Sequence, residues 1–181
     1  MNSGLVEKSK EISYALRHRP EEYGLELDPL GFVLLSDLVH AINEKHKSST
    51  YISENDIDDI IRQSDKKRFE IKSGWIRAMY GHSCDTTIVH KVGIPPNVLY
   101  HGTTRDAFDK HIFDEGLKPM NRQYVHLSES IDTAIKVAKR RSKDIVVITV
   151  DSAKMVKDGI NFYVGNDKVW LCDMVKPKYF L

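Results

Sequence analysis

The chain has 181 residues, in which 27 lysines and arginines nearly balance 26 aspartates and glutamates, for a formal net charge of +1. This balance excludes a protein that attracts nucleic acid through its overall charge, so any anion-binding site must be local. Cys84 and Cys172 lack the spacing of zinc ligands, and no apolar run approaches the roughly 18 residues of a membrane span. The N-terminus has no apolar signal core. We therefore expect a soluble, cytoplasmic protein with reduced thiols and two small lobes.

The first predicted element is a helix that ends in three adjacent cationic side chains. Apolar residues at helical spacing predict a helix over residues 4–18, and Pro20 ends it. Its last turn carries Arg17, His18 and then Arg19. Cations near the C-terminus of a helix often serve only its last carbonyls and its dipole. The stretch alone therefore leaves open whether these side chains bind a ligand.

The next elements follow the order of a winged helix. Residues 31–44 predict a short strand and a helix capped by Ser36, and Ser53 with Asp56 forms the capping-box pattern of a third helix. Two β-type runs around the turn Lys72-Ser73-Gly74 then predict a hairpin. Three helices followed by a hairpin predict a winged-helix lobe.

A winged helix suggests DNA binding through the third helix, but that helix is acidic here. Its side chains include four carboxylates that would face phosphates with like charge, Glu54, Asp56, Asp58 and Asp59. Positive charge lies instead at the end of the first helix and at the entry of the hairpin, in Lys66, Lys67 and Arg68. These two groups would form one patch if the hairpin folds against the first helix.

The pair Pro95-Pro96 marks the best domain boundary, because it ends regular structure between two differently patterned halves. We expect a first lobe over residues 1–94 and a second over 95–181. The second lobe alternates short strands with helices, which predicts an α+β fold. Its expected strands are 98–103, 124–128, 144–151, 160–164 and 168–172, and its expected helices are 104–116 and 129–141.

Familiar phosphate-binding signatures are missing from the sequence. It has no Walker loop, no G-x-G-x-x-G after a strand and no set of His, Cys and carboxylate residues at metal-ligand spacing, so we expect no metal. What remains is a scattered set of arginines and histidines beside short apolar strands. Taken singly, each is as well explained by a solvated helix end, an exposed strand position or a core histidine.

Together, six short motifs in a fixed order change this interpretation. LRH, KRF, IRAMYGHS, YHGT, VHLS and NDKVWL follow one another over nearly the whole chain. In this order they resemble the RNA 2′-phosphotransferase family, the KptA-type enzymes. The resemblance implies a winged-helix RNA-binding lobe followed by an ADP-ribosyltransferase-like lobe with a mixed β-sheet that binds NAD. It also implies NAD-dependent removal of an internal RNA 2′-phosphate, with ADP-ribose 1″,2″-cyclic phosphate as the second product.

The resemblance also implies site residues. The catalytic residues would be Arg17, His18, Arg68 and Arg140. Arginine suits this role because it stays charged and grips phosphate through two parallel hydrogen bonds. His18 would either bond the phosphate or move a proton near neutral pH.

Further residues are implied on the NAD side. They would be His101, Gly102, Thr103, His126, Leu127 and Ser128, with Arg77, His82 and Ser83 next to the ADP-ribose or the RNA phosphate. His101 would bond a ribose hydroxyl, and the glycine at 102 would let the backbone approach the dinucleotide.

Three positions depart from the family pattern. Tyr80 stands where the family usually has glutamine, Tyr124 where it has histidine, and Ala138 where a glycine precedes the late arginine. The two tyrosines imply altered NAD contacts in an active enzyme. Ala138 leaves the choice between Arg140 and Arg141 open.

Two other functions compete with this one. An ADP-ribosyltransferase that modifies phosphorylated nucleic-acid ends, or another acceptor, would need the NAD lobe but not the phosphate-gripping residues. A non-catalytic winged-helix binder would explain the first lobe alone. We expect the two-step enzyme, acting as a monomer with no membrane partner on RNA that carries a 2′-phosphate. A tRNA splice junction is the best-known source of that mark in the family.

Overall fold

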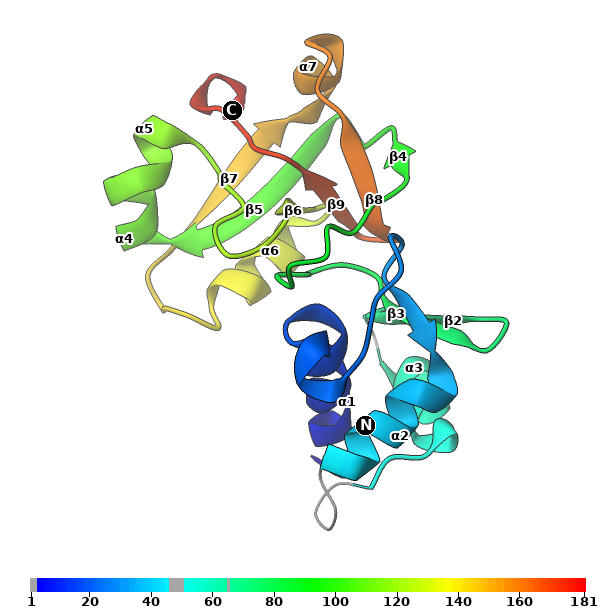
Figure 1. The fold of residues 1–181 in the computed structure, drawn as a ribbon. Helices are drawn as coiled ribbons and strands as arrows, with labels where there is room; N and C mark the ends of the chain where they lie inside the picture. The colour runs from blue at the N-terminus through cyan, green and yellow to red at the C-terminus, as the bar shows by residue number, and fades with distance from the viewer. Residues whose placement is uncertain (1–2, 46–50, 65) are drawn as a thin grey trace. The chain divides into compact units, whose positions relative to one another are not determined.

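The computed structural model describes residues 3–45, 51–64 and 66–181. The chain divides into two compact units, Met1–Val89 and His90–Leu181, which Figure 1 shows in blue to green and in green to red. Both units combine helices with a β-sheet, so the predicted α+β class is confirmed.

The N-terminal unit contains helices and a small sheet. Its elements are α1 (Ser3–Arg17), η1 (Pro20–Tyr23), β1 (Phe32–Leu34), α2 (Leu35–Lys45), α3 (Glu54–Gln63), β2 (Phe69–Lys72) and β3 (Trp75–Ala78). The strands form an antiparallel sheet in the order β1-β3-β2. The core lies between this sheet and the three α-helices.

The first helix follows the predicted apolar pattern. Ile12, Ala15 and Leu16 have no exposed surface, and the helix ends before Pro20, which begins the short 3₁₀ helix η1. Proline suits this position because it lacks the N–H that a continuing helix would need. The predicted helix and its end are therefore confirmed.

The two predicted helix caps have different outcomes. The capping box of α3 is confirmed, since the Ser53 hydroxyl accepts a hydrogen bond from the Asp56 N–H and the Asp56 carboxylate accepts one from the Ser53 N–H. The predicted cap at Ser36 is wrong, because α2 already begins at Leu35. Strand β1 runs directly into α2, so Ser36 lies in the first turn of the helix.

The predicted hairpin is also confirmed. Strands β2 and β3 pair from Phe69 with Ala78 to Lys72 with Trp75, which leaves a two-residue turn. Its residues Ser73 and Gly74 have φ values of 51° and 80°. Positive φ at both positions is what a tight turn needs to match the twist of the two strands.

The C-terminal unit contains a six-stranded sheet with helices. Its strands are β4 (Val92–Gly93), β5 (Val98–Thr104), β6 (Val125–Ser128), β7 (Ile145–Asp151), β8 (Phe162–Asn166) and β9 (Val169–Cys172). Its helical segments are α4 (Arg105–Ala107), the π-helical η2 (Phe108–Ile112), α5 (Phe113–Glu115), α6 (Ile131–Ala138), α7 (Ser152–Lys157) and η3 (Pro177–Tyr179).

The sheet has the order β4-β8-β9-β6-β5-β7, and each neighbouring pair among the described strands is antiparallel. The expectation of a mixed sheet is therefore wrong. That expectation came from the family resemblance. The residues could not correct it, because the two-residue periodicity of a strand reveals which side chains share a face, but not the direction of the neighbouring strand.

Helix α6 covers one face of this sheet, and the apolar core lies on the other. Leu99 of β5 is fully buried in the core, whereas the Gly102 position faces the Ala134 backbone of α6. Helix α6 ends at Ala138, so the expectation of a helix to residue 141 is wrong at its end. Arg140 and Arg141 lie in the turn that follows.

Candidate functional site

The end of α1 places two predicted catalytic residues next to a distant loop. Arg17 is the last residue of α1 and His18 follows it, and both side chains are half-buried. The His18 Nδ1 atom lies 2.8 Å from the Ser83 hydroxyl oxygen, across 65 residues of sequence. The structure thus brings together the LRH and GHS motifs.

The Arg17 side chain is held between backbone and aromatic groups. Its guanidinium carbon lies 5.1 Å from the centre of the Tyr80 ring and 5.9 Å from that of Phe69. Its Nη2 atom lies 3.5 Å from the carbonyl oxygen of Arg68. Each of these three contacts is made to a neutral group and helps to orient the guanidinium.

Arg68 joins the same region from the start of the hairpin. Its Nη1 donates a hydrogen bond to the Ser64 hydroxyl, at 2.6 Å, and its carbonyl accepts one from the Met79 N–H, at 2.9 Å. Together with the contact between Arg17 Nη2 and the Arg68 carbonyl, these bonds show that the hairpin lies against the end of α1. This is the arrangement under which the two groups of positive charge could form one patch. We call Arg17, His18, Arg68, Tyr80 and Ser83 the Arg17 cluster.

Three neighbouring residues have other contacts. Arg77 forms an ion pair with Glu70 on the adjacent strand, at 2.6 Å, and its guanidinium lies 4.6 Å from the centre of the Phe32 ring. Arg19 pairs with Glu21 at 3.4 Å. His82 is only 2% exposed, with Nε2 3.5 Å from the position that a side chain at Gly31 would take. Arg77 thus pairs within its own sheet, and the His82 ring lies beside Gly31.

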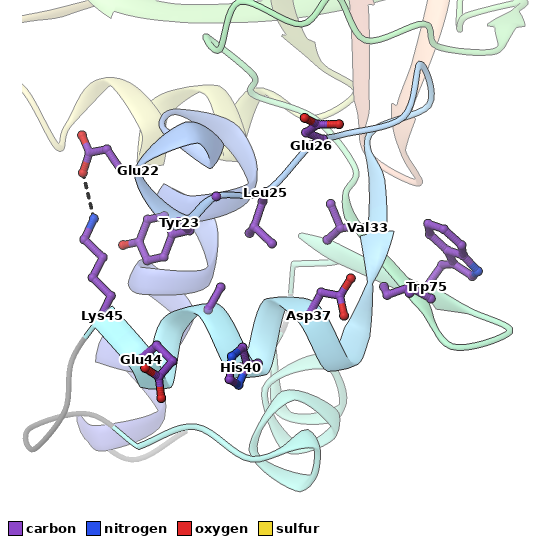
Figure 2. A pocket seen from close by; sticks show the side chains of 13 residues that line it. Glu22, Tyr23, Leu25, Glu26, Val33, Asp37, His40, Glu44, Lys45 and Trp75 are labelled. Carbon is purple, nitrogen blue, oxygen red and sulfur yellow. Dashed lines mark hydrogen bonds and ion pairs between the residues drawn. The ribbon is translucent and has the colours of Figure 1, made fainter.

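A groove of about 810 Å³ opens elsewhere in the N-terminal unit (Figure 2). The predicted site residues, all of which belong to the described part of the chain, are not among its lining residues. Carboxylates from η1, the following loop and α2 line it, namely Glu22, Glu26, Asp37 and Glu44, and only Glu22 is shown in Figure 2 in an ion pair, with Lys45. This charge disfavours a phosphate ligand.

In the C-terminal unit, one ring nitrogen of His101 is engaged by a backbone carbonyl. Its Nδ1 lies 2.9 Å from the carbonyl oxygen of His126. A carbonyl can only accept a hydrogen bond, so Nδ1 carries the proton. Burial lowers the pKa of His101, and the charges of Arg122 and Arg141 lower it further. Burial thus outweighs the hydrogen bond to His126, which raises the pKa, and the lowered pKa favours the neutral ring with its lone pair on Nε2.

Strand β5, which carries His101, is paired unequally with its two neighbours. Within the described residues, β5 and β6 share a single residue pair, Tyr100 with Ser128, whereas β5 and β7 pair along their whole length. The Thr103 and Ser128 side chains are half-buried, but Leu127 is fully buried in the core. The side chain of Leu127 therefore packs inside the protein.

Gly102 has a packing role that the sequence did not indicate. A Cβ atom at this position would lie 2.0 Å from the carbonyl oxygen of Ala134 in α6. Such an approach is impossible, so only glycine allows α6 to lie this close to β5. This steric demand is sufficient to explain a glycine at position 102, so a bound ligand is not needed to explain it.

The two late arginines are both exposed, in the turn after α6. Arg141, and not Arg140, is one of the two cations that lower the pKa of His101. The positive charge of Arg141 therefore acts on one of the candidate NAD residues, His101. The position of Arg140 does not by itself assign it a role.

Tyr124, the second position that departs from the family pattern, lies among other aromatic rings. The Tyr124 ring lies 5.4 Å from that of His90, edge to face, and 5.2 Å from that of Tyr163. Aromatic rings at these distances attract one another. Tyr124 is thus held in an aromatic cluster beside β6.

Three contacts of the two sites were not predicted from the sequence. Ser64 bonds Arg68, Tyr80 packs on Arg17, and Arg122 acts on His101. Ser64 stands four residues before the arginine that it contacts, which is the only local signal among the three. The other two contacts depend on chain segments that meet only in the folded protein.

Two searches of the described residues were negative. No cluster of three or more His, Cys, Asp or Glu side chains is arranged to hold a metal ion within residues 3–45, 51–64 and 66–181. Among the described helices, none has the length and apolar character needed to cross a bilayer.

Comparison with known proteins gives a match over nearly the whole chain. The model of the family described as "RNA 2′-phosphotransferase, Tpt1 / KptA family" matches residues 3–174.

Individual relatives are similar over most of the chain. A probable RNA 2′-phosphotransferase of Acetivibrio thermocellus is 50% identical over 171 residues, which cover 94% of this chain and 93% of the relative. One from Bacillus thuringiensis subsp. konkukian is 46% identical over 173 residues, covering 94% and 91%. One from Pyrococcus furiosus is 41% identical over 161 residues, covering 89% and 86%.

Proposed function

The chain belongs to the RNA 2′-phosphotransferase, Tpt1 / KptA family, and from this premise we propose that it removes an internal 2′-phosphate from RNA in two steps that consume NAD. NAD supplies the ADP-ribosyl group: a 2′-phosphate oxygen bonds to the anomeric carbon of the nicotinamide ribose, and nicotinamide leaves. The neighbouring ribose hydroxyl then bonds to phosphorus, and the RNA 2′-oxygen leaves and takes a proton. The products are 2′-OH RNA and ADP-ribose 1″,2″-cyclic phosphate.

The Arg17 cluster is the observation that carries this proposal. It combines the Arg17 guanidinium and the His18 imidazole at the end of α1 with Arg68, whose carbonyl oxygen contacts Arg17 and whose guanidinium donates a hydrogen bond to Ser64. Two arginines can grip a phosphate through paired hydrogen bonds and stabilise the negative charge on its oxygens during transfer. His18 bonds the same phosphate or moves a proton to or from it.

The residues around His101 fit NAD as the second substrate. A neutral His101 with the proton on Nδ1 offers Nε2 as an acceptor, which suits a ribose hydroxyl donor. The positive charges of Arg122 and Arg141, which act on His101, suit the pyrophosphate of a dinucleotide. These groups would hold the dinucleotide and orient its ribose, while the chemistry of the ADP-ribosyl group belongs to NAD itself.

We propose a different role for each of the two units. The N-terminal unit, with its three α-helices and hairpin, has the element order of a winged helix and would bind the RNA. The C-terminal unit, with His101 on a six-stranded sheet, would form the ADP-ribosyltransferase-like NAD lobe. We assign Arg140 to the phosphate and leave Arg141 on the NAD side.

The test uses an oligonucleotide with one internal 2′-phosphate, incubated with and without NAD, and identifies the products by mass. We expect 2′-OH RNA, free nicotinamide and ADP-ribose cyclic phosphate in equal amounts, only when NAD is present. The same oligonucleotide without the 2′-phosphate is the matched control and should release no nicotinamide. Release of inorganic phosphate without NAD would overturn the proposal, and a stable ADP-ribosylated RNA as the end product would favour the one-step transferase.

A further inference from the structure

The loop after β3 is fixed to the end of α1. The last carbonyl groups of a helix have no partner within the helix and need donors from elsewhere. Here the Arg17 carbonyl accepts hydrogen bonds from the N–H groups of Ser83, at 2.8 Å, and of Cys84, at 3.1 Å. The backbone of Ser83 is therefore held at the residue that precedes His18.

The turn before Ser83 passes close to the Arg17 side chain. Gly81 has a φ of 93°, a conformation that favours glycine, and a Cβ there would lie 3.5 Å from Arg17 Nη1. This turn lets the chain run along Arg17 and deliver Ser83 to the helix end. The path of residues 80–84 is thus determined by backbone contacts rather than by the Ser83 hydroxyl.

With its backbone fixed, Ser83 directs its hydroxyl to one atom of His18. The Oγ–Nδ1 distance of 2.8 Å is that of a good hydrogen bond. A serine hydroxyl can donate or accept, so it can serve Nδ1 in either tautomer and in the imidazolium form. The bond therefore holds the ring while the proton count of His18 changes.

We propose that Ser83 is a positioning residue for His18: it engages Nδ1 and so presents Nε2 to the 2′-phosphate. This inference rests on the proposed function and deepens it, since it names the ring nitrogen that works and the group that orients it. Ser83 acts here through His18, and not by direct contact with the phosphate.

The first part of the test needs no substrate. ¹⁵N chemical shifts of the His18 ring, identified by their loss in His18→Gln, report which ring nitrogen is hydrogen-bonded. We expect Ser83→Ala to shift the Nδ1 signal, and Ser83→Thr, which keeps a hydroxyl, to restore it. Ser13→Ala is the matched control, because its hydroxyl bonds only the Ser9 carbonyl within α1, at 2.7 Å, in the described contacts; it should leave the His18 signals unchanged.

The second part measures single-turnover dephosphorylation of the 2′-phosphorylated oligonucleotide with saturating NAD. A hydrogen bond to a group that is charged for part of the cycle suggests a loss of about 10- to 100-fold in rate for Ser83→Ala. The rate at saturating RNA should fall more than the apparent RNA affinity, and the pH profile should change. Ser83→Thr should recover most of the rate, and Ser13→Ala should match the wild type.

The outcomes separate this inference from the proposed function. Unchanged His18 shifts in Ser83→Ala would overturn it, and so would a loss of RNA affinity that Ser83→Thr does not repair, because Ser83 would then contact the substrate itself. If Ser83→Ala fails to fold, the same shifts in Ser83→Cys, whose thiol is a weak donor, decide the question. A wild-type protein that does not dephosphorylate RNA would refute the function, while the His18 shifts would still report on the Ser83 contact.

Discussion

The guanidinium carbon of Arg17 lies 5.1 Å from the centre of the Tyr80 ring, within the range of a cation–π interaction. Tyr80 is a residue at which this chain departs from its family's pattern. The contact belongs to the N-terminal unit and to an arginine that we assign to the phosphate. We therefore propose that Tyr80 acts on the phosphate through Arg17, while the altered NAD contact that the family resemblance implied for Tyr80 stays a prediction.

We predict that Tyr80→Ala reduces the rate of dephosphorylation while Tyr80→Phe retains it. Cation–π contacts contribute about 0.5–2 kcal/mol, which corresponds to a change of about 2- to 30-fold in rate if the contact holds Arg17 in its working position. Single-turnover rates of the two variants measure the effect, with Tyr51→Ala, at a 74% exposed side chain, as control. Equal losses in both Tyr80 variants would indicate that the hydroxyl, and not the ring, matters.

A second prediction assigns the late arginine. If Arg140 grips the phosphate in the second step, Arg140→Ala slows that step by about 10²–10³, the usual effect of losing one stabilising donor. RNA that carries a 2′-phospho-ADP-ribose adduct should then accumulate, and a gel time course resolves substrate, adduct and product.

Two matched variants accompany this experiment. His101→Ala should slow nicotinamide release and leave little adduct at any time, because it weakens positioning of the dinucleotide. Arg141→Ala should resemble His101→Ala, since Arg141 acts on His101. If Arg141→Ala accumulates adduct and Arg140→Ala does not, the late arginine is Arg141.

The third prediction concerns Gly102 and stability. Gly102→Ala places a Cβ where the Ala134 carbonyl oxygen lies, at 2.0 Å, so α6 must move away from β5. Overpacking of this kind costs about 1–3 kcal/mol or more in the free energy of unfolding. Urea unfolding followed by circular dichroism measures it without any ligand.

The matched control tests the cause of that loss. Ala138→Gly removes the methyl group that would lie 3.1 Å from the new Cβ, but not the closer backbone oxygen. The double variant Gly102→Ala/Ala138→Gly should therefore remain destabilised. A stable Gly102→Ala protein with weakened NAD binding would show instead that the glycine serves the dinucleotide.

The fourth prediction links Asp56 to pH. Its hydrogen bond with Lys8, at 2.8 Å, and those with Ser53 lower the pKa of Asp56 from 3.8 to about 2. Because the folded-state pKa lies below that of the unfolded chain, the ionised carboxylate stabilises the protein above about pH 4. This contribution is lost as the pH falls from about 4 to about 2.

Asp56→Ala should thus cost about 0.5–2 kcal/mol at neutral pH, as expected for a lost helix cap, and progressively less below pH 4. Urea unfolding of both proteins at a series of pH values gives the difference. Asp58→Ala, at an exposed position of the same helix, should show a smaller difference at neutral pH. A constant cost of Asp56→Ala down to pH 2 would contradict the assignment.

Local chemistry explains which parts of the fold could be predicted. The capping box at Ser53 and the hairpin turn at Ser73-Gly74 depend on residues close together in the chain, and both are confirmed. The ion pair of Arg77 with Glu70 could also have been predicted, because a two-residue turn fixes that register. Strand direction and the end of α6 depend on tertiary packing, and sequence periodicity does not report them.

The candidate site, too, could be predicted only in part. Arg17, His18 and Arg68 were proposed from motif order, and the structure brings them together, but their roles remain predictions. The contacts that orient them could not be predicted, since Tyr80 and Ser83 reach α1 only through the folded hairpin. The need for a glycine at position 102 could likewise not be predicted from the sequence, because the carbonyl that excludes a side chain there belongs to a helix more than 30 residues later.

The hydrogen bonds that the Ser83 and Cys84 N–H groups donate to the Arg17 carbonyl also have a consequence for biosynthesis. A ribosome makes α1 first, yet the groups that complete its end emerge only after the hairpin. Contacts between residues so far apart in sequence form late in folding, since the intervening loop must first be ordered. A nascent chain that stops before Ser83 therefore has the residues of α1 but no fixed orientation for His18. On this basis the proposed phosphate site should form only once the whole N-terminal unit has left the ribosome.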